Sequence, residues 1–185
     1  NWSGSYIRQV QVDTTPPVFT GEEELVLACE GGGTAPRPAV LPVSAIDAVD
    51  GPVPIADDLP ERIPLGTTEA HLTARDRAGN EAAMTLRVLV IDAVPPEIEC
   101  PPPLTLYTAG MAPVMPPEDW RARAYDLCEG EVAAAAEPAG PYLPGTVTIV
   151  WSARDSSGNE ARCEAVLEVA GGAAFRRGYA NDDGA

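Results

Sequence analysis

The chain has 185 residues and a net charge of −16, from 28 acidic and 12 basic residues, and every basic residue is arginine. Because such an acidic surface repels phosphate groups, we expect neither nucleic acid nor anionic membranes as partners. No apolar run approaches the ~20 residues that a membrane helix needs, which predicts no membrane insertion. A well-solvated surface explains the acidity most simply, and bound cations are the alternative use for it.

Short apolar runs separated by turn residues fill the first half of the chain. Pro16 and Pro17 cannot donate ladder hydrogen bonds, so they predict a stiff, extended entry segment. Pro42 predicts that its strand is an edge strand or contains a bulge. Helical periodicity is convincing nowhere, and the one candidate for a short helical turn is 117–127. The predicted strands lie at 18–19, 24–28, 39–46, 53–55, 68–75 and 83–91.

The same pattern returns 79 residues later, which indicates two copies of one domain. Residues 13–91 placed on residues 92–170 give 22 identities without a gap, against roughly five or six expected by chance. The tight turn at 76–80 reappears at 155–159, between apolar runs that alternate as half-buried strands do. Short strands with frequent turn signals predict an all-β protein of two tandem immunoglobulin-like β-sandwich domains, residues 13–91 and 92–170.

The two ends of the chain are assigned by their place in this repeat. Residues 1–12 end in a strand-like run that matches the position of the last strand, so we expect the last strand of an upstream repeat or an N-terminal extension. Gly171 and Gly172 open a polar stretch, which predicts a flexible tail or linker over 171–185. The chain starts at Asn1 without a signal peptide, so we expect a piece of a longer protein.

Four cysteines are present, at Cys29, Cys100, Cys128 and Cys163. Cys100 lies early in the first strand of the second copy and Cys163 early in its last strand. These strands are neighbours in an immunoglobulin-like sandwich, so we expect the two to pair, for ~3–4 kcal/mol on the loop-entropy model. The first copy has Gly21 and Met84 there and lacks this link. A disulfide implies an oxidising, extracytoplasmic compartment.

Cys29 and Cys128 occupy non-equivalent positions in the two copies. Three states stay open for them: free thiols, a pair with each other, or pairs with partners outside this chain. No Cys-x-x-Cys is present and the chain has a single histidine, so the spacing fits no zinc motif.

Several motifs follow one another in a fixed order and spacing, at 92–101, 124–130 and 143–163 in the second copy and at 13–17, 45–51 and 76–80 in the first. In this order and spacing the chain resembles a known extracellular family, the hyalin-repeat module. The first copy looks like the same module or its close relatives, the bacterial Ig-like surface repeats. The resemblance implies an Ig-like sandwich used in tandem for adhesion or as a spacer in secreted and surface proteins. The family's cysteines map onto Cys100 and Cys163, which implies the same disulfide.

Acidic turns are the candidate chemistry of the sequence. In the predicted sandwich, the turns of each copy and the acid that precedes its first strand lie at the same end. Ca²⁺ takes six to eight oxygen ligands, which gathered carboxylates can supply. The competing interpretation is that each aspartate caps its own turn, which is sufficient to explain Asp followed by Gly-Asn. The candidate calcium ligands are Asp13, Asp47, Asp50 and Asp76 in the first copy and Asp92, Asp126, Glu129 and Asp155 in the second.

No catalytic residue is predicted. His71 lies in the middle of a strand, and no Gly-x-Ser-x-Gly accompanies it. Leu72 and Trp151 occupy equivalent positions and are expected in the cores, whereas Trp2 and Trp120 are expected in core or rim packing.

The sequence thus predicts a non-catalytic structural or adhesive spacer of a larger secreted or cell-surface protein. Its partners would be neighbouring domains of the same chain or proteins at the cell surface. Two alternatives stay open. One is an accessory domain pair of a secreted enzyme. The other is a self-assembling subunit of an extracellular fibre, in which residues 6–12 would complete a neighbour's sheet by strand addition.

Overall fold

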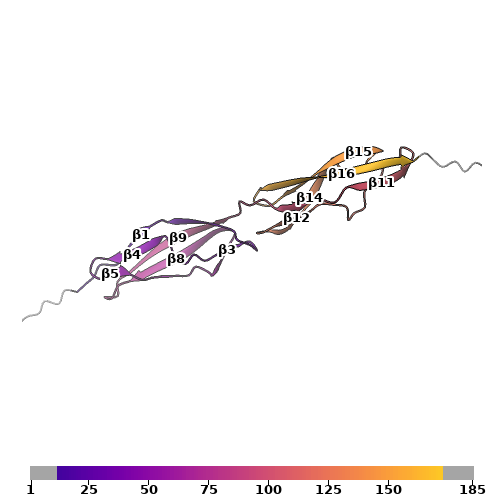
Figure 1. Cartoon of the computed structure of the whole chain (residues 1–185). Helices are drawn as coiled ribbons and strands as arrows, with labels where there is room; N and C mark the ends of the chain where they lie inside the picture. The colour runs from indigo at the N-terminus through magenta and orange to yellow at the C-terminus, as the bar shows by residue number, and fades with distance from the viewer. Residues whose placement is uncertain (1–11, 173–185) are drawn as a thin grey trace, which may run out of the picture. The chain divides into compact units, whose positions relative to one another are not determined.

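The computed structural model describes residues 12–172, which form β-strands joined by turns and loops (Figure 1). Within that range there is no helix, and therefore none that is long and apolar enough to cross a membrane. The all-β prediction is confirmed, and residues 117–127 form a turn and a strand rather than a helical turn. The chain divides into two compact units, Asn1–Asp92 and Ala93–Ala185.

The first unit is a β-sandwich with sheets β1-β4-β5 and β2-β9-β8-β6 and a small ribbon, β3-β7. Its longest strands, β8 and β9, form a hairpin in which Arg75 stands opposite Glu81. Leu72 and Leu86 on this hairpin are completely buried, which confirms the core position of Leu72. The strands are β1 (Val18–Gly21), β2 (Glu24–Ala28), β3 (Thr34–Pro36), β4 (Val43–Asp47), β5 (Gly51–Val53), β6 (Ile55–Asp57), β7 (Arg62–Pro64), β8 (Gly66–Arg75) and β9 (Glu81–Ile91).

The second unit repeats this architecture with sheets β10-β12-β13 and β11-β16-β15-β14. The pairing register repeats at the same spacing of 79 residues. Asp47 stands opposite Gly51 in the first unit, and Asp126 stands opposite Gly130 in the second. The strands are β10 (Glu97–Glu99), β11 (Leu104–Ala109), β12 (Arg123–Asp126), β13 (Gly130–Val132), β14 (Ala134–Glu137), β15 (Gly145–Arg154) and β16 (Glu160–Gly172).

The two predicted pieces of the first strand belong to different sheets. β1 pairs antiparallel with β4, whereas β2 pairs parallel with β9. Gly21 makes the switch at a φ of +129°, and a Cβ there would collide with the carbonyl of Pro42. Pro42 itself precedes β4, which lies in the middle of its sheet rather than at an edge. The missing N–H of this proline therefore costs no ladder bond.

The predicted tail requires a correction at its start. Gly171 and Gly172 are the end of β16 and pair with Thr108 and Ala109 of β11. A Cβ at Gly171 would lie 2.7 Å from the carbonyl oxygen of Gly110. Glycine is needed at position 171 because two backbones approach closely, so it did not signal a linker. Residues 173–185, like 1–11 at the other end, lie outside the described residues.

The core of the second unit is built around two tryptophans and a disulfide. Trp151 and Trp120 are buried and meet edge to face, with ring centroids 6.3 Å apart. Cys100, just after β10, is bonded to Cys163 of β16. Because β10 and β16 belong to different sheets, the bond joins the two layers instead of two hydrogen-bonded neighbours. The expected pair is therefore present, across the sandwich.

Candidate cation sites in the aspartate turns

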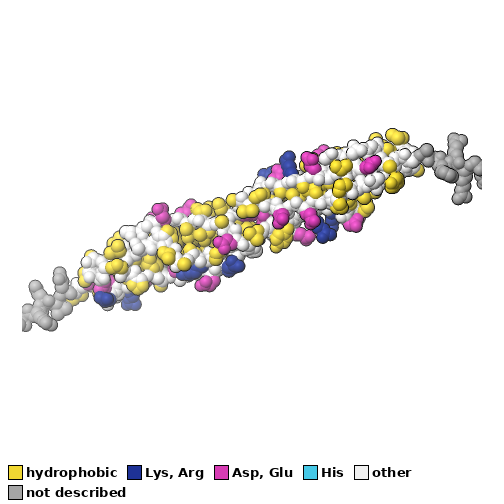
Figure 2. All heavy atoms as spheres, in the orientation of Figure 1, with side chains coloured by type: hydrophobic (Ala, Val, Ile, Leu, Met, Phe, Trp, Pro, Cys, Tyr) yellow, Lys and Arg dark blue, Asp and Glu magenta, His cyan; other side chains and the backbone are white. Residues whose placement is uncertain are grey.

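Among the described residues, the buried charged side chains are four aspartates at two pairs of equivalent positions, namely Asp47, Asp76, Asp126 and Asp155. All four belong to the predicted ligand set. Other acidic side chains are scattered over the visible face of each unit without forming one patch (Figure 2). Burial of an ionised carboxylate is costly unless hydrogen bonds or a counter-charge replace its water. The partners of these four groups therefore decide what they do.

Asp76 closes the β8–β9 hairpin. Its Oδ1 accepts hydrogen bonds from the amides of Gly79 and Asn80, and its Oδ2 accepts one of 2.7 Å from the Asn80 side chain. Gly79 adopts a φ of +98°, which an L side chain rarely tolerates. Burial acts to raise the pKa of Asp76, but these hydrogen bonds outweigh it and hold the pKa below its ordinary value. This carboxylate stays ionised and holds its own turn.

Asp47 ends β4 and uses only one of its oxygens in the turn that follows. Oδ1 accepts hydrogen bonds from the amides of Val49 and Asp50, at 2.8 and 2.9 Å. Oδ2 is buried, in a residue that is only 2% exposed, and has no hydrogen-bond partner within residues 12–172. Turn capping thus accounts for only one of the two oxygens of this carboxylate.

Asp13 precedes β1 and reaches the same place. Its Oδ1 accepts hydrogen bonds from the amide and hydroxyl of Thr15, and its Oδ2 is buried without a partner in the part of the chain that the structure describes. The side-chain amide of Asn80 donates to the carbonyl of Thr15 at 3.2 Å, which ties this segment to the hairpin turn. One ligand atom from each of Asp13, Asp47 and Asp76 lies within 4.8 Å of the other two. The structure therefore brings three of the four predicted ligands of the first copy together.

Asp50, the fourth, lies outside that group. Its Oδ2 accepts a 2.7 Å hydrogen bond from the amide of Arg77, and its Oδ1 lies 3.7 Å from the Arg77 guanidinium. It links two turns rather than adding a ligand.

The second unit repeats these arrangements. Asp126 accepts hydrogen bonds at Oδ1 from the amides of Cys128 and Glu129, and its Oδ2 is buried without a partner among the described residues. Asp155 caps the β15–β16 turn through Asn159. Burial acts to raise the pKa of Asp155, but hydrogen bonds to its carboxylate outweigh this effect and again hold the pKa below its ordinary value. Of the two remaining predicted ligands, Glu129 accepts a 2.8 Å hydrogen bond from the amide of Ser156, and Asp92 is the last residue of the first unit.

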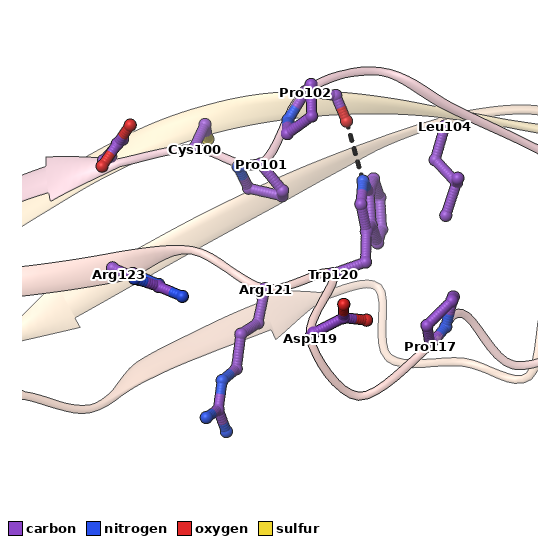
Figure 3. Close-up of a pocket in the computed structure, with 10 residues that line it drawn as sticks. Cys100, Pro101, Pro102, Leu104, Pro117, Asp119, Trp120, Arg121 and Arg123 are labelled. Atoms are coloured by element: carbon purple, nitrogen blue, oxygen red, sulfur yellow. Dashed lines mark hydrogen bonds between the residues drawn. The ribbon is translucent and has the colours of Figure 1, made fainter.

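The tryptophan for which core and rim packing were both expected is part of the core. Trp120 lies against Pro102 and Leu104, and its indole N–H donates a 2.7 Å hydrogen bond to the Pro102 carbonyl (Figure 3). The hollow beside it is also lined by Asp119, Arg121 and Arg123. No pattern in the sequence distinguished this tryptophan from Trp2, which lies outside the described residues.

Two further polar contacts escaped the sequence analysis. Arg37 donates a 2.7 Å hydrogen bond to Asp57, forming an ion pair inside the first unit. His71 is 69% exposed, and its Nδ1 lies 2.9 Å from Oδ2 of Asp58. Nothing along the chain marks either pair, since their members are 20 and 13 residues apart.

No described cysteine is free. Cys29 and Cys128, for which three states were open, are both disulfide-bonded. This removes the free-thiol alternative.

The fold and its turns define a class of protein: β-sandwich units, repeated in register, with buried aspartates in their turns. No family model matches the chain. It is similar to Hyalin of Strongylocentrotus purpuratus, with 29% identity over 171 residues, which cover 81% of this chain and 13% of hyalin. It is also similar to the Mus musculus protein "Sushi, von Willebrand factor type A, EGF and pentraxin domain-containing protein 1". That match has 30% identity over 118 residues and covers 60% of this chain and 3% of the mouse protein. The chain thus spans a small part of each relative.

The solved structures that the chain matches include cadherin ectodomains. The protocadherin gamma B7 extracellular domains 1–4 align at a TM-score of 0.35 with 14% identity, covering 85% of this chain and 51% of that one. Mouse cadherin-23 EC22–24 aligns at a TM-score of 0.37 with 13% identity, covering 83% of this chain and 66% of that one.

Proposed function

We propose that the chain is a non-catalytic pair of β-sandwich modules that serves outside the cell as a structural or adhesive segment of a larger protein. The similarity to hyalin over 81% of the chain supports this role. The disulfides support the location, because such bonds persist in oxidising compartments.

The observation that carries the proposal is the shortness of the strands at the edges of each large sheet. The ten- to thirteen-residue strands β8, β9, β15 and β16 all lie inside their sheets, each paired with its hairpin partner on one side and, over part of its length, with a shorter edge strand on the other. The edge strands β2, β6, β11 and β14 have only three to six residues. Short edges offer little template for another chain. Each unit is thus self-contained, as a module in a tandem array needs to be.

The same observation disfavours a fibre assembled by strand addition. A donated strand needs an open edge of useful length, and the edge strand β14 is followed directly by Pro138. Residues 6–11 of the predicted donor strand lie outside the described residues. We therefore expect the chain to stay monomeric.

Two measurements on the full chain test the proposal. Sedimentation velocity from micromolar to sub-millimolar concentration should give one monomeric species, and polymers that grow with concentration would overturn the self-contained module. Beads coated with the folded chain should adhere to matrix-coated surfaces more than beads coated with reduced, carboxymethylated chain. Equal adhesion of the two bead types would overturn the adhesive role and leave that of a spacer.

A further inference from the structure

The carboxylates of Asp13, Asp47 and Asp76 are too close together to be explained by turn capping alone. One oxygen from each lies within 4.8 Å of the others, and Asp47 and Asp76 are 2% and 7% exposed. Like charges repel strongly where little water separates them. A cluster of acids can nevertheless occur without a ligand, so the partners of each oxygen decide the matter.

An unpartnered, buried oxygen supplies the independent observation. Asp47 satisfies its turn with Oδ1, while its Oδ2 is buried and receives no hydrogen bond from the described residues. Asp13 shows the same division between its two oxygens. Buried polar atoms nearly always have a partner in native proteins. Two anionic oxygens without one, in a group of three carboxylates, therefore call for a positive ligand.

The second unit shows that this is not an accident of one turn. Asp126, the counterpart of Asp47, is 1% exposed and also uses Oδ1 for two amides, while its Oδ2 has no partner in the described range. None of the residues between the first aspartate and the last glycine is the same in the two turns. What both copies keep is the buried aspartate with one oxygen left over.

No basic side chain of the described residues forms an ion pair with Asp13, Asp47 or Asp76. Arg77 follows Asp76 directly, but its guanidinium lies 3.7 Å from Asp50, outside the group, and is 88% exposed. A cation from solution is therefore a suitable partner.

We propose that Asp13, Asp47 and Asp76 hold a Ca²⁺ ion in the first unit. Hard carboxylate oxygens in an irregular arrangement suit Ca²⁺, which accepts six to eight oxygens, with water filling the positions that the three residues leave. Mg²⁺ demands a nearly ideal octahedron and fits less well. Because Asp13 precedes β1, the ion fastens the entry segment to the β4–β5 and β8–β9 turns, beside the hydrogen bond from Asn80 to Thr15. The proposal concerns the first unit alone and does not depend on the adhesive role.

Calcium binding to the full, metal-free chain tests the site, by calorimetry and by thermal unfolding with Ca²⁺, Mg²⁺ or a chelator. Extracellular calcium modules bind with a Kd of roughly 10⁻⁴–10⁻³ M, so we expect saturation in the low millimolar range and a higher Tm with Ca²⁺ than with Mg²⁺. The absence of both heat and Tm shift with Ca²⁺ would overturn the proposal.

Isosteric variants locate the ion. Asp47→Asn keeps the oxygen that caps the turn and replaces the unpartnered one with an amide, so Ca²⁺ affinity at this site should fall by about tenfold or more. Asp13→Asn should do the same, and it changes a residue outside the strands, so the fold is not at risk. Asp119→Asn, on an exposed loop of the second unit, makes the same charge change and should bind like the wild type. Unchanged Ca²⁺ stoichiometry and affinity in both cluster variants would place the ion elsewhere and overturn the proposal.

Discussion

The carboxylate of Asp50 accepts a 2.7 Å hydrogen bond from the backbone amide of Arg77, which fastens the β4–β5 turn to the β8–β9 turn. The second unit repeats the bond between Glu129 and the amide of Ser156, at 2.8 Å. The link tolerates both residue changes because it needs only a carboxylate on one turn and a backbone N–H on the other.

Removal of this link should loosen the first unit measurably. For Asp50→Ala we expect the free energy of unfolding to fall by about 1 kcal/mol, the usual net value of such a bond at a partly exposed site. Urea unfolding in the presence of a chelator measures the change without any contribution from bound metal. Asp50→Asn keeps an acceptor and should retain most of the stability. An Asp50→Ala protein as stable as the wild type would show that the bond contributes nothing.

The sequence predicted the repeated strands and turns because both depend on local chemistry. The turn at 76–80 follows from Asp76, Gly79 and Asn80 alone. The exchange of sheets between β1 and β2 and the length of β16 depend on close backbone approaches at Gly21 and Gly171. A glycine that makes room for a distant carbonyl looks the same in a sequence as a glycine in a linker.

The candidate site shows the same limit. Its aspartates were found because turn aspartates form a pattern in both copies. Which of their oxygens are already engaged depends on backbone amides placed by the fold, so the odd oxygen of Asp47 became visible only in three dimensions. The separate role of Asp50 has the same cause, because Arg77 is distant along the chain.

Trp120 should contribute to stability through its N–H as well as its ring. Trp120→Phe removes the hydrogen bond to the Pro102 carbonyl and part of the edge contact with Trp151. We expect a loss of about 1–3 kcal/mol in the free energy of unfolding of the second unit. Near-ultraviolet circular dichroism during urea unfolding measures it. Tyr107→Phe is the matched control, since Tyr107 is 82% exposed and its change should stay within about 0.5 kcal/mol. Equal effects of the two substitutions would contradict this role.

The bond between Cys100 and Cys163 should stabilise the second unit selectively. It closes a separation of 63 residues, worth about 4 kcal/mol on the loop-entropy model. Replacement of both cysteines by alanine should therefore lower the unfolding transition of the second unit and leave that of the first unchanged. Equal shifts of both transitions would mean that the bond does not act within one unit.

Before any reduction, a thiol titration of the unfolded wild-type chain should find no free sulfhydryl, because all four cysteines are bonded.

The first unit should also lose a small contribution to stability in acid, through Asp58. The amide of His71 donates a 2.7 Å hydrogen bond to Asp58, and the His71 ring lies 2.9 Å from its other oxygen. These contacts, the amide first, hold the pKa of Asp58 below its ordinary value of 3.8. A lowered pKa in the folded state means that the unfolded chain binds the proton more readily, so the contribution is present above about pH 4 and is lost as the pH falls through the folded pKa. We therefore expect the difference in the free energy of unfolding between wild type and Asp58→Asn to become smaller as the pH is lowered from about 5 to about 2.5. Urea unfolding at each pH measures this difference. A difference that stays constant over this range would mean that the ionised carboxylate gains nothing from His71.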